Sequence, residues 1–160
     1  MAAAWIVSMH LGGLAAAQST SALSDAAESG DLAKITALIE KGSDAKAAQV
    51  DGMTALHWAA YRDDVPMASL LIKAGADVKA ANRYSVTPLS LACANGNAEL
   101  VELLLKAGAD PRATRRGGET ALMTAARTGK PGPVKSLLAR GVDVDAKDRK
   151  GQTALMWAAA

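Results

Sequence analysis

The sequence predicts an all-α solenoid in which helix-turn-helix units of equal length stack side by side, and two observations support this fold class. The first is an internal repeat of 33 residues, marked by Thr54, Thr87, Thr120 and Thr153, with Ser21 one period earlier. The second is a composition that is 50% hydrophobic but only 3% aromatic, without any Phe. Its apolar residues are mainly Ala and Leu, which favour helices and allow them to pack closely. A fixed period of this length is typical of chains whose units contact only their neighbours.

Many further positions of the unit repeat at the same spacing. In its first half a leucine and an alanine recur in every unit, at Leu23, Leu56, Leu89, Leu122 and Leu155, and at Ala26, Ala59, Ala92, Ala125 and Ala158. In its second half a leucine recurs at Leu38, Leu71, Leu104 and Leu137, and a glycine at Gly42, Gly75, Gly108 and Gly141. An aspartate follows at Asp44, Asp77, Asp110 and Asp143, and an alanine at Ala47, Ala80, Ala113 and Ala146. Agreement in so many columns excludes chance.

Each unit carries the signals of two short helices. Thr54 is placed to cap the N-terminus of a first helix, and Pro88 takes the first helical position of the next unit, where its missing N–H is harmless. The second helix is clearest at residues 100–105, whose apolar stripe is broad enough to be buried on more than one side. Gly108 follows where a left-handed C-cap is expected. The polar stretch after it, often with a glycine near its tip, predicts a turn that projects from the stack.

Three segments resemble the ankyrin repeat. These are Thr87-Pro88-Leu89, the Leu-His-Trp-Ala-Ala at residues 56–60 and the Leu-Leu-Leu-Lys-Ala-Gly-Ala-Asp at residues 103–110. The resemblance extends over about residues 20–160 and implies stacked helix pairs with β-hairpin fingers at a right angle to them. It divides the chain into a capping repeat at 18–48, full repeats at 49–81, 82–114 and 115–147, and a partial repeat at 148–160. We expect the array to continue beyond this partial repeat, since it has no second helix.

A few positions depart from the repeat pattern. Asp63 stands where Gly96 stands one unit later, and Asp tolerates the left-handed turn conformation better than most residues. Ser85 replaces the glycine of the third finger, which is therefore expected to be less regular. Pro131 and Pro133 fall in the first turn of a second helix, where proline is tolerated.

The N-terminus has the pattern of a signal peptide. Residues 1–17 contain no charged side chain, are mostly apolar and end in three alanines before Gln18, which indicates cleavage after Ala17. No Lys or Arg follows Met1, although such segments normally begin with positive charge. An apolar N-terminal extension and a membrane anchor are the alternatives, but the segment is short and broken by glycine for a spanning helix.

Charge and cysteine content argue against several classes of function. A net charge of +2, with a pI near 8.8, is too small a bias to indicate nucleic acid as the partner. Cys93 is the single cysteine, and no Cys/His spacing resembles a zinc site. We therefore expect no metal, no cofactor and no enzymatic activity.

Four features that could carry chemistry are interpreted as structural. His57 occupies a repeat column held elsewhere by serine or methionine, and Cys93 occupies an alanine column. The repeated aspartate could suggest a calcium ladder, but hydrogen bonds at the turn are the favoured interpretation. Trp58 and Trp157 share one helical column and are interpreted as packing residues rather than ligand-stacking ones.

Columns that vary between repeats are free to specify a partner. The resemblance places the binding residues on the fingers and on the concave side of the first helices, where Tyr and Arg recur, the residue types enriched at interface hot spots. The predicted protein-binding residues are Asp51, Met53, Tyr61, Arg62, Arg83, Tyr84, Val86, Asn95, Arg116, Glu119, Arg127, Thr128 and Arg149, together with Val50, Lys150 and Gln152.

The sequence therefore predicts an exported, monomeric scaffold that binds another protein without chemistry of its own. Basic residues outnumber acidic ones on the predicted surface, which favours a partner with an acidic patch, although solvated charges without a role are an alternative. A Gram-negative periplasm is the most natural destination; the cytoplasm applies if the N-terminus is not a signal. We expect neither nucleic-acid binding nor stable membrane insertion. The alternative functions are a docking or regulatory region of a larger enzyme, and a secreted effector or inhibitor.

Overall fold

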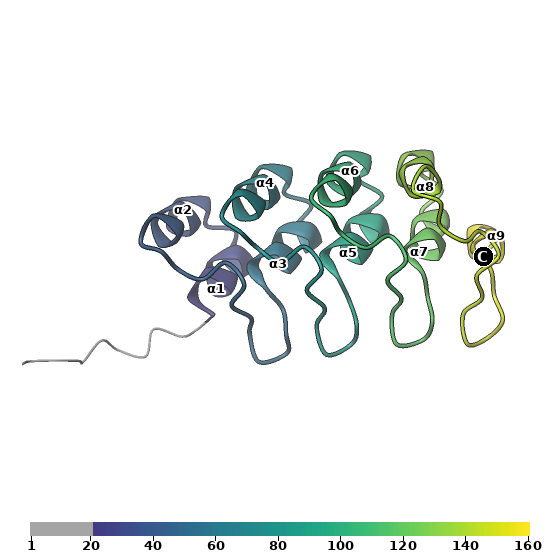
Figure 1. The fold of residues 1–160 in the computed structure, drawn as a ribbon, viewed down its shortest axis with the longest axis horizontal. Helices are drawn as coiled ribbons and strands as arrows, with labels where there is room; N and C mark the ends of the chain where they lie inside the picture. Colours follow the sequence, from purple (N-terminus) through teal and green to yellow (C-terminus); the bar gives the residue numbers. More distant parts are fainter. Residues whose placement is uncertain (1–20) are drawn as a thin grey trace, which may run out of the picture.

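The computed structural model describes residues 21–160, which form an array of short α-helices (Figure 1). The predicted signal peptide at residues 1–17 lies outside the described residues. The helices of the described part are α1 (Ala22–Ser29), α2 (Leu32–Glu40), α3 (Ala55–Tyr61), α4 (Val65–Lys73), α5 (Pro88–Asn95), α6 (Ala98–Lys106), α7 (Ala121–Arg127), α8 (Pro131–Leu138) and α9 (Ala154–Ala158). Within that part no helix has the length and apolar character needed to cross a bilayer.

The helices form two rows. An inner row contains α1, α3, α5, α7 and α9, and an outer row contains α2, α4, α6 and α8 (Figure 1). Each inner helix packs against the next inner helix, and all but α9 also pack against the outer helix that follows in the chain. The predicted all-helical solenoid is confirmed.

Six of the nine helices in the described residues begin at side-chain caps. The hydroxyls of Thr54, Thr87 and Thr120 accept hydrogen bonds from the backbone N–H three residues later, as predicted for Thr54. The outer helices α2, α4 and α6 use Asp31, Asp64 and Asn97 in the same way. Lys130 provides no side-chain cap to α8, whose first turn instead holds Pro131 and Pro133.

The turns between helices use the left-handed backbone region. Gly108 has φ 97°, and Asp63 has φ 62° where Gly96 has φ 71°. Both predicted left-handed positions are confirmed. In the loops that follow α2, α4, α6 and α8, each repeated aspartate accepts a 2.9 Å hydrogen bond from the backbone N–H two residues later, which confirms their local role at Asp44, Asp77, Asp110 and Asp143.

A continuous apolar core runs between the two rows. The repeated leucines Leu23, Leu56, Leu89 and Leu122 are buried on the inner row, and Leu71, Leu104 and Leu137 are buried on the outer row. The repeated alanines Ala59, Ala92 and Ala125 are also buried, and their small size lets neighbouring inner helices approach closely.

The fingers are hairpin-shaped turns rather than pairs of strands. Among the described residues the only β-pairing consists of single antiparallel bridges, between Ala48 and Thr54 and between Thr114 and Thr120. The expectation of a less regular third finger is confirmed in one respect, because this finger lacks the bridge that the second and fourth fingers have. Its turn, however, is regular. Its hydrogen bonds, from Asn82 N–H to Val86 C=O and from Ser85 N–H to Asn82 C=O, match those of the second finger. Ser85 adopts φ 58°, and the Asn82 carboxamide oxygen braces the turn by accepting two backbone N–H bonds.

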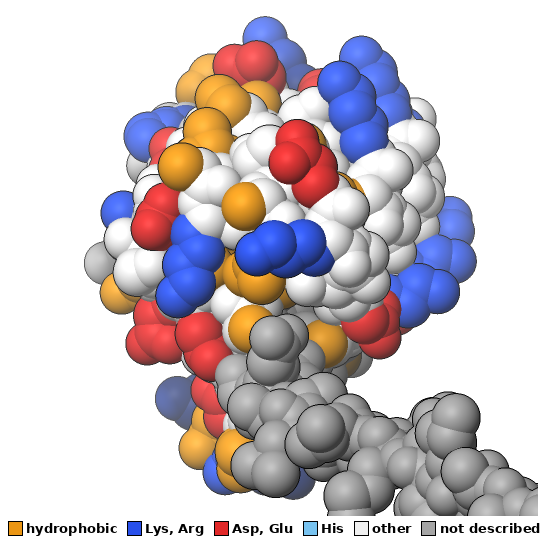
Figure 2. Space-filling model, turned by 90° about the vertical axis from the view of Figure 1, so that its left-hand side faces the viewer, with side chains coloured by type: hydrophobic (Ala, Val, Ile, Leu, Met, Phe, Trp, Pro, Cys, Tyr) orange, Lys and Arg blue, Asp and Glu red, His pale blue; other side chains and the backbone are white. Residues whose placement is uncertain are grey.

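The N-terminal end of the array is covered by a mixed surface. Figure 2 shows this end, where hydrophobic side chains are interspersed with Lys, Arg, Asp and Glu. On α2 the exposed Leu32 lies among charged residues, including Lys34 and Glu40. Terminal units of repeat proteins need such a polar outer surface for solubility.

His57 connects two units of the stack. Its Nε2 lies 2.9 Å from the Val86 carbonyl oxygen and donates to it, and its Nδ1 accepts from the Thr54 hydroxyl at 2.8 Å. Burial lowers the pKa of His57, against smaller opposing effects of the Val86 bond and of Asp51 and Asp77. The neutral ring therefore fits this position.

We expect the apolar core to be most sensitive to truncation of a side chain where a leucine is fully buried. Leu104→Ala should lower the free energy of unfolding by about 2–5 kcal/mol, because it leaves a cavity between α6 and its neighbours. Leu32→Ala is the matched control, since Leu32 is 41% exposed and Leu104 is 0% exposed. Urea unfolding of both variants checks this expectation, and equal losses would contradict it.

The stability of the array should fall as the pH drops below the pKa of an unfolded histidine, about 6.5. Because the folded pKa of His57 is lowered, its neutral form stabilises the fold above that pH, and this contribution is lost as protons bind the unfolded chain preferentially. His57→Ser, which places the residue type of Ser90 in the same column, should reduce this loss. Urea unfolding of both proteins at pH 7.5 and 5.5 tests this expectation. His10 is present in both proteins, so its contribution to the pH dependence is the same in each. The same pH dependence in both proteins would refute the role of His57.

Candidate functional site

The fingers and the exposed sides of the inner helices lie on one face of the array. The fingers at residues 48–54, 81–87, 114–120 and 147–153 project from the inner row in the same direction (Figure 1). We call the exposed side chains of these fingers and of α3, α5, α7 and α9 the finger face. The bases of the fingers contact the inner helices, because the indole N–H groups of Trp58 and Trp157 donate to Gln49 and Asp148 at 2.8 and 3.2 Å.

Most predicted binding residues lie at least partly exposed on the finger face. Tyr61 and Tyr84 are 61% and 57% exposed, and the side chain of Val50 is fully exposed at a finger tip. The exposed arginines are Arg62, Arg83, Arg116, Arg127 and Arg149, joined by Lys150. The half-buried residues are Asp51, Val86, Asn95, Glu119, Thr128 and Gln152.

The prediction for Met53 requires correction, because its side chain is only 9% exposed. Its carbonyl oxygen accepts from Gln49 N–H and closes the second finger, and its sulfur lies 3.5 Å from the Asn82 carboxamide nitrogen of the third finger. Met53 therefore packs between two fingers and belongs to the framework.

Other predicted residues hold the framework through their polar groups. Asn95 donates to the carbonyl oxygens of Ala60 and Tyr61, at 2.9 and 3.3 Å, and so links α5 to the end of α3. The Thr128 hydroxyl donates to Ala125 C=O at the end of α7. These side chains position the surface more than they offer free groups to a partner.

The exposed arginines keep their charge without a carboxylate partner in the described part of the chain. Arg62 and Arg83 donate instead to the backbone carbonyls of Glu28 and Val50, at 3.3 and 2.8 Å. The Arg127 guanidinium lies 5.4 Å from the centre of the Trp157 ring, a cation–π contact. An ion pair does form on the outer helices, between Arg140 and Glu102 at 3.4 Å. The finger face thus carries more basic than acidic side chains, and none of its arginines forms an ion pair among the described residues.

An aromatic and polar cluster at the second repeat was missed by sequence reasoning. Trp58 meets Tyr61 edge to face with ring centres 5.8 Å apart, and the Gln49 carboxamide donates to Asp25 and Glu28 at 2.8 Å each. Trp58 is half-buried, as a packing residue should be. The repeat position shared by Gln49, Asn82, Arg115 and Asp148 could have pointed to this cluster, because its residue type varies between units. The structure places this position at the bases of the fingers. In this column Arg115 differs, because its Nε is buried and has no hydrogen-bond partner in the described residues.

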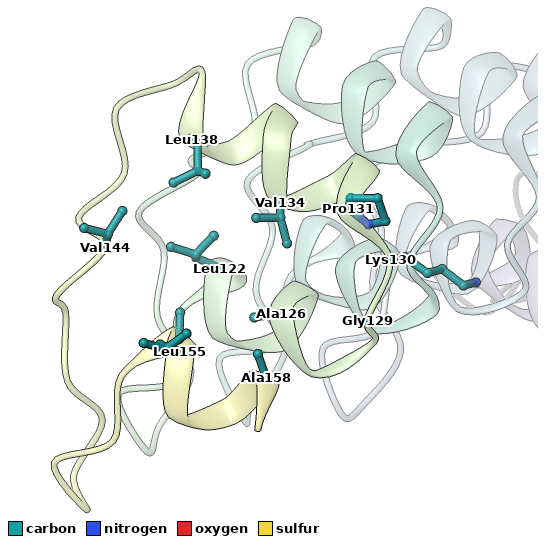
Figure 3. Close-up of a pocket in the computed structure, with 11 residues that line it drawn as sticks. Leu122, Ala126, Gly129, Lys130, Pro131, Val134, Leu138, Val144, Leu155 and Ala158 are labelled. Atoms are coloured by element: carbon teal, nitrogen blue, oxygen red, sulfur yellow. The ribbon is translucent and has the colours of Figure 1, made fainter. Parts of the chain in front are cut away.

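An apolar groove lies at the end of the array near α9 (Figure 3). It has a volume of about 360 Å³ and is lined by side chains of α7, α8 and α9, among them Leu122, Val134, Leu138 and Leu155. Leu155 is 80% exposed, whereas Leu122 in the same repeat column is 4% exposed. In the described chain no outer helix packs on α9, so this surface continues the core without a cover.

His57 and Cys93 do not supply reactive groups to the finger face. Both ring nitrogens of His57 are occupied by the contacts that join two repeats. Cys93 is buried in the stack, and burial raises the pKa of its thiol to about 12. A thiol of such a pKa stays protonated near neutral pH and is a poor nucleophile. The predicted structural positions of both residues are confirmed.

Comparison with known proteins agrees with this architecture. The family described as ankyrin repeats (3 copies) matches residues 23–115 and 90–160, which together span most of the chain. A comparison with curated proteins gives no match. The repeating caps, the buried leucine columns and this match lead to one conclusion: the chain belongs to the ankyrin-repeat family.

Proposed function

We propose that this ankyrin array is a non-enzymatic scaffold that binds another protein through its finger face. Ankyrin repeats are in general protein–protein interaction modules. The observation that carries the proposal is the set of exposed arginines that lack carboxylate partners and lie on the same face as two exposed tyrosines. Arginine and tyrosine are the residue types that contribute most at interface hot spots.

The partner is proposed to present an acidic patch to the third, fourth and fifth fingers. Arg83, Arg116 and Arg149 occupy the same position in these fingers, one in each. Asp148 forms no ion pair with these arginines in the described residues, and its carboxylate accepts instead from Gln152 N–H, Lys150 N–H and the Trp157 indole. The Gln152 backbone bond is the largest of the effects that lower the pKa of Asp148. Acidic groups facing this row would gain charge-assisted hydrogen bonds and faster association.

The tyrosines are proposed to supply the apolar part of the contact. Tyr61 is held by its edge-to-face contact with Trp58, so that little side-chain freedom remains to be lost on binding. Tyr84 lies at the tip of the third finger beside Arg83. A mixed aromatic and basic surface fits a folded partner or loop with carboxylates next to apolar side chains.

The scaffold is proposed to act after export, as a monomer in the periplasm or outside the cell. The support for export is the uncharged, alanine-terminated segment at residues 1–17. Two alternative functions would also use the finger face. A docking or regulatory region of a larger enzyme would require a catalytic segment in the same polypeptide, and a secreted effector or inhibitor would require a target in another organism.

Reversing charge on two fingers should abolish partner capture. In Arg83→Glu with Arg116→Glu, the acidic patch of the partner would meet like charge, and the expected loss is at least tenfold in affinity, or roughly 1.4 kcal/mol. The matched control is Lys106→Glu with Lys135→Glu, two exposed lysines on the outer helices. A photo-crosslinker at Tyr84 reports capture from periplasmic extract, and circular dichroism verifies the fold. Equal capture by both double variants would refute the finger face as the binding site.

Export should be visible as cleavage after Ala17. Expression of the full chain with a C-terminal tag should yield a periplasmic protein whose intact mass is that of a chain beginning at Gln18. Ala17→Arg should block cleavage, because signal peptidase sites need small residues there. A protein that stays in the cytoplasm with its N-terminus intact would contradict export and leave the binding proposal standing.

A further inference from the structure

We infer that the row of fingers is divided between the third and fourth fingers by a joint that opens in solution. The two blocks are the fingers at residues 48–54 and 81–87, and the fingers at residues 114–120 and 147–153. Arg83 lies on the first block and Arg116 on the second. A partner that contacts both arginines, as the proposed function requires, would span the joint.

The first block is held together by hydrogen bonds between its two fingers and by one from α3 to the third finger. Arg83 N–H donates to Asp51 C=O at 3.0 Å, and the Arg83 guanidinium donates to Val50 C=O at 2.8 Å. His57 adds the bond from its Nε2 to Val86 C=O at 2.9 Å. These contacts fix the second and third fingers side by side.

The second block repeats the backbone bond. Arg149 N–H donates to Gly117 C=O at 2.9 Å, at the positions two repeat units after those used by the first block. The inner helices α7 and α9 of the same two units are joined as well, by the stacking of Arg127 on Trp157.

The equivalent bond is absent at the middle junction. By the repeat spacing it would join Arg116 N–H to Tyr84 C=O, but no hydrogen bond connects residues 81–87 with residues 113–120 in the described chain. The histidine link is missing too, because Ser90 takes the place of His57 and its short hydroxyl donates to Thr87 C=O inside its own unit. Below the fingers, the two units remain joined by a 2.9 Å bond from Lys130 Nζ to Asn95 C=O.

Ser85 explains why the fingers separate at this junction. The corresponding residues of the second and fourth fingers are Gly52 and Gly118. A Cβ built on Gly52 would lie 2.9 Å from the Asn82 Cα of the next finger, a distance that real Cβ atoms do not adopt, and one on Gly118 would lie 3.4 Å from the Asp148 Cα. The close approach of the second and third fingers thus requires a glycine, whereas a Cβ on Gly118 would be in ordinary van der Waals contact with the fifth finger. At the middle junction Ser85 brings a Cβ and a hydroxyl to the place of Gly52.

A cavity occupies the space between the two blocks. It has a volume of about 320 Å³ and is lined by Ser85 and Thr87 of the third finger and by Ala113 and Thr114 of the loop and finger that follow. This space is open to solvent and is not filled by side chains, so few packed contacts hold the fourth finger to the third. The fourth finger can therefore move relative to the third while the helices stay stacked.

Amide hydrogen exchange tests the joint in the free protein. The amides of Arg83, Arg116 and Arg149 are equivalent by position and residue type, and nuclear magnetic resonance follows each of them separately. We expect Arg116 to exchange faster than the other two. Ser85→Gly should let the fingers close and slow the exchange of Arg116 by roughly tenfold, the effect of one net hydrogen bond, while Arg83 and Arg149 remain unchanged.

The reciprocal variant is Gly52→Ser, which should accelerate the exchange of Arg83 by a similar factor and leave Arg149 unchanged. Gly118→Ser should have a smaller effect on Arg149, since its Cβ has more room. Protection of Arg116 equal to that of Arg83 in the unaltered protein, or no response to Ser85→Gly, would overturn the inference. No partner enters these measurements, so a failure of the charge-reversal experiment leaves their outcome unaffected.

Discussion

The structure depends on one constraint, which is that no unit can bury its own leucines. Leu56 on α3 is buried only because α1 and α5 pack on either side of it, and Leu104 on α6 is buried by the same arrangement in the outer row. This requirement fixes the unit length, since a change in length would move the leucines out of contact. The caps, the alanine columns and the left-handed turns all serve to return the chain to the same position in each unit.

The parts of the fold that could be predicted are those decided within one unit. Thr54 caps α3 and Asp63 turns the chain through contacts with its immediate neighbours in sequence, and both are evident from the residues themselves. The details that the sequence does not reveal are contacts with a neighbouring unit. The burial of Met53 depends on the third finger, and Asn95 is engaged by carbonyl groups 34 and 35 residues earlier in the chain. A column comparison identifies such positions as variable but does not tell whether a variable side chain faces solvent or a neighbouring finger.

The finger face shows how a repeat protein separates stability from recognition. The buried columns hardly change between units, whereas the residue at the base of each finger changes from Gln49 to Asn82, Arg115 and Asp148. Their local contacts are not all alike: Gln49 bridges two carboxylates and an indole, whereas Asn82 and Asp148 each brace their own turn. The surface can therefore change from unit to unit while the helices beneath it stay in place. Arg83 combines both roles, because its guanidinium holds a neighbouring finger and remains exposed.

The nearest-neighbour arrangement also limits how far apart in sequence contacting residues lie. Among the described residues, side-chain hydrogen bonds reach at most 38 residues along the chain, from Arg140 to Glu102, a span only slightly longer than one unit. Adding units to such an array does not lengthen its contacts, in contrast to globular folds, where the two ends of the chain often meet. Since folding slows as the average separation of contacting residues grows relative to chain length, a longer array of this kind meets no growing topological barrier to folding.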